Sequence, residues 1–395
     1  MLREPARRAR TMPLDIFDPA HYVTTRLPEL EAETLPPWAY TSQAFYEREV
    51  ERIFLKVWNF LGRADHIPDP GDYFTVEFVG VPLIIVRDHE GQLRAFVNSC
   101  RHRGTILVEG QGNCRAFRCP YHSWVFGLDG RCLGAPEMGR TRGFDPANYP
   151  LLPVRLETWA GFLFVNFDET APPLSEYLGD LPDNLAGHVA ADLVCVRRKV
   201  YDLRCNWKIF AENAKEAYHI ATVHRKTINQ YASAEVAKYE YVPVRGQYAM
   251  NYAEHPGVSM ALLKGDTGFP AIETLDERAR RGTLSPFIFP CTYIAATIDT
   301  LWYLELHPHG PDRTTLVHGA CFPRAYTRRP DFEEVVKNYY KRWDITLEED
   351  IAICELQQRG LASRINGRGR FCHREKVVHQ IDNWVLDRVL SRGDG

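Results

Sequence analysis

Hydrophobic and polar positions alternate or form short runs through the first half of the chain, which indicates strands. Residues 73–99 are rich in β-branched and aromatic side chains and contain an internal turn signal. An Asp-Gly pair at 129–130 marks a second hairpin, and residues 159–168 form another strand-like run. Ahead of these strands, apolar residues spaced three and four apart predict a helix over 43–62. The pattern as a whole predicts a small, mainly β domain over residues 45–170.

Longer helical stretches enclose a group of strands in the second half. No glycine or proline interrupts residues 206–224, which we expect to form one helix. Strand-like runs fall within 285–321, and further helices are predicted at 331–343, 348–361 and 375–390. This order predicts an α+β domain, with a sheet flanked by helices, rather than alternating βαβ units.

A proline-rich stretch at 169–183 is the expected domain boundary. We therefore expect an N-terminal segment over 1–44 that packs on the second domain, the β domain over 45–170, and the α+β domain over 171–395. A chain of 395 residues is long enough for this organisation.

Composition narrows the class of protein. A formal charge of −3 gives no reason to expect nucleic acid or an anionic membrane as a partner. No apolar run nears the roughly 18 residues of a membrane span, and the basic N-terminus lacks the apolar stretch of a secretory signal. We expect a cytoplasmic location, with a disordered tail before Met12, and ten cysteines that are thiols or metal ligands rather than disulfides. Without a GxGxxG fingerprint or a Walker loop, neither NAD nor ATP is expected to bind by those routes.

Two short motifs in the β domain each combine a thiol with an imidazole. Cys100-x-His102 and Cys119-x-x-His122 are separated by sixteen residues, so two loop tips can meet. Two cysteines and two histidines suit tetrahedral zinc. They also suit a Rieske [2Fe–2S] cluster, in which two histidines replace two cysteines on one iron. Zinc fingers usually pair cysteine with cysteine along the chain, whereas this alternating order lets each loop supply one ligand to each iron.

The sequences CRHRG and CPYHSW resemble the Rieske domain of Rieske non-haem iron oxygenases, the family of the aromatic-ring-hydroxylating alpha subunits. Arg103, Gly104, Tyr121 and Trp124 match the flanks of the family motif. The resemblance, which extends from about residue 40 to 390, implies a Rieske domain beside a helix-grip catalytic domain, a twisted antiparallel sheet wrapped on a long helix. It implies that a [2Fe–2S] cluster is held by Cys100, His102, Cys119 and His122.

A second group of candidate ligands follows in ENAKEAYHIATVHRKT, beyond what an electron carrier would need. His219 and His224 lie five apart, so a helix end or a bulge must separate them. Two histidines and one carboxylate form the facial triad of non-haem Fe(II) oxygenases. By itself this spacing also fits two unrelated histidines, but the resemblance implies that both bind a catalytic Fe(II). Asn213 and Tyr218 also resemble the catalytic segment of the family.

The third ligand is expected from WDITLEEDIAICELQQRGLAS, which resembles the C-terminal ligand helix of the family. There an aspartate precedes a glutamate by five residues, as Asp350 precedes Glu355. The resemblance therefore implies that Asp350 binds the iron. Thr346 and Glu349 fit a capping box, which would assign Glu349 to the backbone of a helix start. Taken alone, residues 348–350 also fit a solvated helix start.

Glu216 precedes His219 by three residues and is expected, with Asn213, to serve catalysis. The resemblance implies that this acid orients His219 and bridges it to a cluster histidine of a neighbouring subunit. Many relatives have aspartate here; by the residues alone, Glu216 also fits an exposed helix position. The resemblance further implies a homotrimer and a separate NAD(P)H reductase, with or without a ferredoxin, that supplies electrons for the reaction of O2 with a small molecule.

Two subgroups of the family leave the substrate open. An aromatic acid would require an arginine, for which Arg225 and Arg245 are candidates. A quaternary amine such as choline, a betaine or carnitine would require an aromatic cage. Candidates for the cage are Tyr231, Tyr239, Trp302 and Tyr303. We expect hydroxylation of an aromatic or related carboxylate, with the quaternary amine as the alternative and an electron-transfer protein without oxygenase activity as a remote one.

Overall fold

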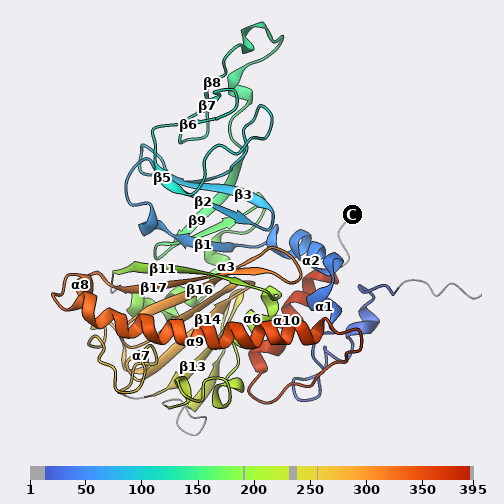
Figure 1. Ribbon diagram of the computed structural model, residues 1–395, viewed down its shortest axis with the longest axis vertical. Coiled ribbons are helices and arrows are strands. Elements are labelled where there is room, and N and C mark those ends of the chain that lie inside the picture. The colour runs from blue at the N-terminus through green and yellow to red at the C-terminus, as the bar shows by residue number, and fades with distance from the viewer. Residues whose placement is uncertain (1–13, 190–191, 231–237, 256, 392–395) are drawn as a thin grey trace, which may run out of the picture.

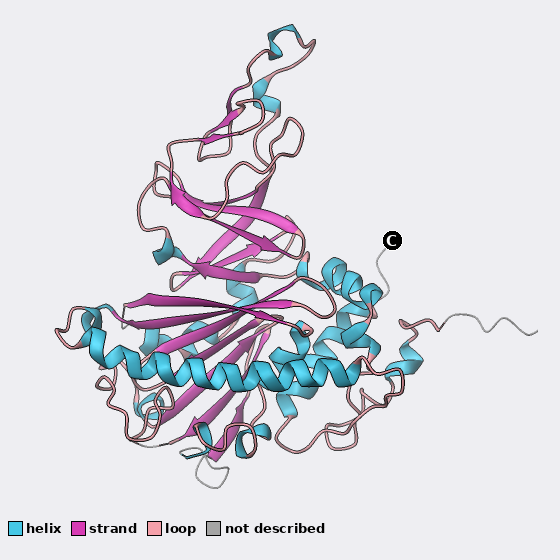
Figure 2. Cartoon of the chain, viewed as in Figure 1, coloured by secondary structure: helices cyan, strands magenta, loops and turns pink. Residues whose placement is uncertain are grey.

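Two bodies built around separate β-sheets stack along the long axis of the molecule (Figure 1). This computed structural model describes residues 14–189, 192–230, 238–255 and 257–391. The tail predicted before Met12 and the cage candidate Tyr231 lie outside the described residues. Figure 2 shows strands in both bodies, whereas the longest helix belongs to the lower one. An all-β first domain followed by an α+β domain is confirmed, while the bounds of the three predicted segments stay a prediction.

The first body consists of antiparallel strands. Its seven-stranded sheet has the order β1-β10-β9-β4-β3-β2-β5, and β6, β7 and β8 form a small sheet at the outer end (Figure 1). These strands are β1 (Asn59–Arg63), β2 (Asp72–Phe78), β3 (Val81–Arg87), β4 (Leu93–Val97), β5 (Gln111–Asn113), β6 (Phe117–Arg118), β7 (Val125–Phe126), β8 (Cys132–Gly134), β9 (Pro153–Trp159) and β10 (Phe162–Asn166). The Asp-Gly pair at 129–130 connects β7 to β8, as predicted.

The helix predicted over 43–62 is wrong in its second half. Helix α2 (Gln43–Glu49) continues as a π-helical turn, η2 (Val50–Phe54), and the chain then enters β1. Asn59 ends the helical segment because its side-chain amide donates to the carbonyl oxygens of Phe54 and Val57, at 2.8 and 2.9 Å. Such carbonyls have no partner at the end of a helix. The pairing of β1 with β10 outweighs the helical spacing of the apolar residues.

The second body is an antiparallel sheet that curls around one long helix. Its strand order is β11-β17-β16-β15-β14-β13-β12. Helix α9 (Phe332–Leu361) lies across the sheet, with α6 (Trp207–Asn213) and α10 (Lys376–Val389) nearby (Figure 1). Phe322 packs against α9, with its ring centroid 5.0 Å from that of Tyr339 and 6.1 Å from that of Trp343. The strands are β11 (Leu193–Leu203), β12 (Lys238–Val242), β13 (Tyr248–Glu254), β14 (Gly282–Ile288), β15 (Thr292–Ala296), β16 (Leu301–Pro308) and β17 (Thr314–Pro323).

Short helical segments connect these elements, and the described part of the N-terminal segment packs on the second body. Arg26, for example, forms an ion pair with Asp387 at 2.7 Å. No helix among the described residues has the length and apolar character needed to cross a bilayer. The short segments are η1 (Pro19–Tyr22), α1 (Trp38–Thr41), η3 (Ala64–His66), η4 (Met138–Arg140), η5 (Pro146–Asn148), α3 (Leu174–Leu178), α4 (Leu181–Asn184), α5 (Ala186–Val189), η6 (His219–Ala221), η7 (Ile228–Gln230), α7 (Glu277–Arg280) and α8 (Arg324–Thr327).

Candidate metal centres and active site

The first candidate centre lies on two loops of the first body. Cys100 and His102 follow β4, and Cys119 and His122 lie between β6 and β7. The amide of Gly104 donates to the carbonyl oxygen of Cys100 at 2.8 Å and closes the first loop. Its φ of +77° is a conformation that favours glycine, which accounts for this flank of the motif.

The four candidate ligands form two like pairs. The thiols of Cys100 and Cys119 are buried and act on each other electrostatically, and the ring centroids of His102 and His122 lie 4.7 Å apart. Burial acts to raise the pKa of Cys119, but the amides of Tyr121 and His122 lower it below its usual value, which favours a thiolate. In the described chain, no three of these four ligand atoms lie within 4.8 Å of one another. Zinc requires four ligands around one point, whereas two pairs suit the two irons of a Rieske cluster.

The second candidate centre begins where α6 ends. The helix predicted over 206–224 is wrong beyond Asn213, and the short segment η6 and turns follow. The carboxylate of Glu216 accepts hydrogen bonds from the amides of Tyr218 and His219. Such local bonds compete with a helix for the backbone. The irregularity expected between His219 and His224 is therefore present, and it turns both side chains toward α9.

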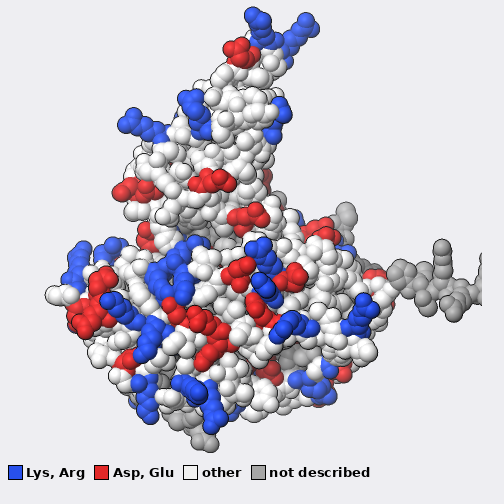
Figure 3. Space-filling model, in the orientation of Figure 1, with Lys and Arg blue, Asp and Glu red and all other residues white. Residues whose placement is uncertain are grey.

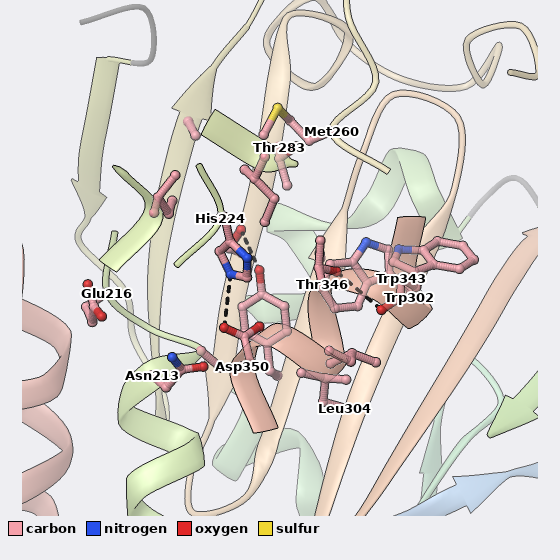
Figure 4. Close-up of a pocket in the computed structure, with 18 of the residues that line it drawn as sticks. Asn213, Glu216, His224, Met260, Thr283, Trp302, Leu304, Trp343, Thr346 and Asp350 are labelled. Atoms are coloured by element: carbon pink, nitrogen blue, oxygen red, sulfur yellow. Dashed lines mark hydrogen bonds and ion pairs between the residues drawn. The ribbon is translucent and has the colours of Figure 1, made fainter. Parts of the chain in front are cut away.

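His219, His224 and Asp350 converge on one point. Asp350 Oδ1 lies 3.4 Å from His219 Nε2 and 2.9 Å from His224 Nε2, and one ligand atom from each of the three residues lies within 4.8 Å of the other two. Figure 4 shows His224 and Asp350 facing each other, with Asn213 beside them at the cavity wall. Two imidazoles and one carboxylate in this arrangement match a facial triad for Fe(II).

Each of these histidines has its own carboxylate behind it. His219 Nδ1 contacts Glu216, and His224 Nδ1 lies 2.7 Å from Glu349, which also accepts a hydrogen bond from Thr227 at 2.8 Å. With both Nδ1 atoms bound to carboxylates, the Nε2 atoms are left to face the metal. Glu216 was predicted from the sequence as a support for His219, whereas the role of Glu349 was not.

The capping box predicted from Thr346 and Glu349 is wrong. The helices predicted over 331–343 and 348–361 form the single helix α9, so no helix begins at Thr346. The hydroxyl of Thr346 donates to the carbonyl oxygen of Arg342 at 3.0 Å, one turn earlier in the same helix. Glu349 is therefore free to reach His224, and the acidic run at 348–350 is not a solvated helix start.

The charges around the second centre favour a cation. Burial acts to lower the pKa of His219, but Asp350 and Glu216 raise it to about 9. Burial also acts to raise the pKa of Asp350, but the two histidines lower it below its usual value. Three carboxylates thus surround two imidazoles, and a divalent cation between the Nε2 atoms and Asp350 would balance them. The side chains present fit a mononuclear iron.

Replacing Glu349 with glutamine is expected to weaken iron binding at the second centre by roughly 10- to 100-fold, because a neutral amide orients and polarises His224 less well. Iron per chain should be measured after dialysis against graded Fe(II) concentrations. The matched control is Glu348→Gln, which changes the adjacent, exposed carboxylate. Equal iron affinity in the two variants would contradict this role for Glu349.

A cavity opens beside the triad between α9 and the sheet. Its volume is about 140 Å³, enough for a small organic molecule. Its walls carry the aromatic residues Phe210, Tyr239, Tyr293, Trp302 and Trp343 and one arginine, Arg342. Figure 4 shows Trp302 and Trp343 on one side of this space and Asp350 at its base.

The structure separates the candidates for substrate binding. Tyr239 and Trp302 line the cavity, but Tyr303 packs between the two sheets, with its ring centroid 5.0 Å from that of Phe60. Arg225 is exposed, and Arg245 is 87% exposed beside Asp180, so neither lines the cavity. These three assignments are wrong. Arg342 was missed, although its position eight residues before Asp350 puts both on one face of a helix.

Comparisons with known proteins divide the chain in the same way. Residues 57–150 match the Rieske [2Fe-2S] domain, and residues 190–391 match the catalytic domain of the ring-hydroxylating alpha subunit. The carnitine monooxygenase oxygenase subunit of Acinetobacter baumannii is 30% identical over 86% of this chain and 88% of its own length. The chloroplastic choline monooxygenase of Spinacia oleracea is 29% identical over 95% of this chain and 82% of its own length.

Solved structures agree with these matches. The quaternary ammonium Rieske monooxygenase CntA in complex with L-carnitine superposes with a TM-score of 0.75 at 26% identity, over 90% of this chain and 96% of that chain. Naphthalene 1,2-dioxygenase with bound indole has a TM-score of 0.76 at 20% identity, over 94% and 95%, a likeness of fold alone. Each matched domain of this chain contains one of the two candidate centres.

Proposed function

Because this chain belongs to the Rieske non-haem iron oxygenases, with the catalytic domain of ring-hydroxylating alpha subunits, we propose that it hydroxylates or demethylates a small quaternary amine. Membership of this family makes the chain an oxidoreductase with a [2Fe–2S] cluster and a mononuclear iron. The similarity to carnitine and choline monooxygenases favours the amine over the aromatic substrate expected first. An electron carrier without oxygenase activity would leave the second centre without a purpose.

The observation that carries this proposal is the aromatic wall beside the triad. Tyr293 and Trp302 lie with their ring centroids 5.2 Å apart, and Trp343 lies 6.2 Å from Trp302. Together with Tyr239, these side chains line the cavity. The faces of aromatic rings attract quaternary ammonium groups, which have no N–H to donate and are recognised in this way.

The residues of both centres have separate tasks in this proposal. The cluster and the iron would supply electrons and O2 activation, so that one oxygen atom enters a C–H bond, the other leaves as water, and NAD(P)H provides two electrons. The iron would be held by His219, His224 and Asp350, with Glu216 and Glu349 fixing the imidazoles. The cluster would be held by Cys100, His102, Cys119 and His122. The cavity between α9 and the sheet would hold the substrate beside the triad and displace water from it.

Partners are inferred from the family and from the surface. Enzymes of this family take electrons from a separate reductase and pass them between subunits. We infer a homotrimer in which Glu216 faces the neighbouring subunit, since the adjacent Tyr218 is 61% exposed. Figure 3 shows basic side chains on the outer part of the first body. Arg103 lies on one cluster loop and Arg118 directly before the other; both are exposed and suit an acidic electron donor. The cytoplasmic location stays a prediction.

The test measures cofactors and turnover on anaerobically purified protein. We expect three irons and two acid-labile sulfides per chain, because a [2Fe–2S] cluster and one further iron are bound, and a Rieske-type EPR signal after reduction. With a reductase and NAD(P)H, O2-dependent product should form from choline, glycine betaine or carnitine, and not from benzoate. Oxidation of benzoate alone would contradict the amine proposal, and zinc without sulfide would contradict both centres.

A further inference from the structure

We propose that Arg342 binds a carboxylate of the substrate, so that the amine oxidised is a betaine-type zwitterion rather than a simple cation such as choline. This inference rests on the proposed function, which it narrows to one charge class. Three features of Arg342 support the inference. It is buried without a carboxylate partner, it lines the cavity, and it lies on the same helix as Asp350 of the triad.

Arg342 is a buried cation whose hydrogen bonding is incomplete. Arg342 is 6% exposed. In the described structure its side chain makes one hydrogen bond, from Nη1 to the hydroxyl of Thr346 at 3.2 Å. The guanidinium lies 5.7 Å from the ring centroid of Trp302. Among the described residues no carboxylate forms a hydrogen bond with it. Burial lowers the pKa of Arg342 to about 10, so the side chain still carries its charge at neutral pH.

Arg63, another buried arginine, has the hydrogen-bond and ion-pair partners that Arg342 lacks. Arg63 is 3% exposed, and it pairs with Asp65 at 3.0 Å and donates to the carbonyl oxygens of Ala160 and Leu193, at 3.1 and 3.0 Å. A buried charge needs such partners because it has lost its hydration. Arg342 has five N–H donors and uses one of them on a hydroxyl.

The acids nearest to Arg342 are occupied elsewhere. Asp350 faces the two histidines, and Glu349 accepts from His224 and Thr227. Their charges act on Arg342 only through space. The free N–H groups of Arg342 are open to the cavity, whose occupant can supply the anion, and a guanidinium matches a carboxylate through two parallel hydrogen bonds.

The position of Arg342 on α9 sets the length of the substrate. Arg342, Thr346 and Asp350 follow at intervals of four residues, so they share one face of the helix. The bond to Thr346 directs the guanidinium toward the triad, which leaves about one helical turn, roughly 6 Å, between the anchor and the level of Asp350. A compact betaine spans this interval, with its carboxylate at Arg342 and an N-methyl group at the triad.

Charge then separates betaines from choline. Choline would bring a second positive charge next to an uncompensated guanidinium and no anion to pair with it. A betaine supplies the carboxylate to Arg342, which already faces the Trp302 ring, and presents its ammonium to the other aromatic side chains of the cavity wall. We therefore expect the wild-type enzyme to prefer glycine betaine or carnitine to choline.

The test compares ligand binding in the wild-type holoenzyme and in Arg342→Gln by isothermal titration with glycine betaine, carnitine, choline and benzoate. We expect the variant to bind the zwitterions roughly 30-fold or more weakly, the usual consequence of leaving one charge of a buried pair alone, and to bind choline no more weakly. The matched control is Lys341→Gln, which changes the neighbouring exposed cation that pairs with Asp266. Cluster content and melting temperature report folding, and Arg342→Lys, which keeps the charge but not the fork, is expected to fall between.

The outcomes keep the two proposals apart. Equal affinity of wild type and Arg342→Gln for the zwitterions, or a wild-type preference for choline, would overturn the role of Arg342 while the amine oxygenase stands. Binding and oxidation of benzoate that depend on Arg342, without any turnover of amines, would overturn the zwitterion and the amine proposal together. If Arg342→Gln loses its cluster, Arg342→Lys decides, and affinity of that variant for the zwitterions equal to that of the wild type would overturn the inference.

Discussion

Replacing Asp350 with asparagine is expected to lower substrate oxidation by at least about 1,000-fold and to leave the Rieske cluster in place. The carboxylate is the one anionic ligand among the three residues that converge at the second centre. An amide oxygen carries no charge and binds Fe(II) far less strongly than a carboxylate does. We expect iron per chain to fall from three to two, with two sulfides and the EPR signal of the cluster unchanged. Product formation with a reductase, NAD(P)H and O2 measures the loss.

A control on the same helix tests whether the effect is local. Asp331 lies at the N-terminal end of α9, exposed and paired with Arg329 at 2.8 Å, so Asp331→Asn is expected to keep full turnover and three irons. Turnover in Asp350→Asn close to that of the wild type would mean that the third ligand lies elsewhere. Loss of sulfide along with the iron would mean that the variant is misfolded rather than lacking one metal.

Replacing Glu216 with glutamine is expected to lower turnover about 100-fold even when excess Fe(II) restores the second iron. The carboxylate contacts His219 Nδ1 and the amides of Tyr218 and His219, so it holds both the ring and the turn that presents it. Its side chain is 12% exposed beneath the exposed Tyr218, which puts it between the iron ligand and the molecular surface. Electrons that arrive from a neighbouring cluster would have to pass this point. Turnover should be followed together with iron content.

Comparison with Glu349→Gln distinguishes two roles for Glu216, orientation of its histidine and electron transfer. Both carboxylates support a histidine through Nδ1, but Glu349 lies on α9 behind the buried His224. If Glu216 only orients its histidine, both variants will recover with added Fe(II). Recovery of Glu349→Gln alone, with partial activity in Glu216→Asp, is the expected pattern and would support a role for Glu216 in electron transfer.

Local chemistry explains why most of the site could be predicted from the sequence. Cysteine and histidine ligands need particular residue types at short spacings, and the motif around Cys100 and Cys119 contains them within 23 residues. The curled sheet and its long helix followed from the resemblance that these residues carry. His219 and His224 could be identified for the same reason, because these two ligands lie only five residues apart in the sequence.

The errors arose where a side-chain contact, near or distant in the sequence, overrides the local pattern. The absence of glycine and proline suggested a helix through Glu216, but the carboxylate of Glu216 accepts hydrogen bonds from backbone amides, and the chain turns there instead. Thr346 and Glu349 matched a helix start, although no glycine or proline occurs between residues 331 and 359 to end the preceding helix. The role of Glu349 depends on His224, 125 residues away, and no local pattern contains that contact.

The continuous helix α9 also constrains how enzymes of this design can change substrate. Arg342, which binds the carboxylate, and Asp350, which binds the iron, lie on the same helix. The distance between them is therefore set by the helical repeat and not by a flexible loop. Moving the arginine by one residue would rotate it about 100° out of the cavity, whereas moving it by a full turn would lengthen the reach by about 5.4 Å. Enzymes of this design that bind longer zwitterions would therefore differ from this one by whole helical turns. The number of residues between the arginine and the aspartate in their sequences would show the change.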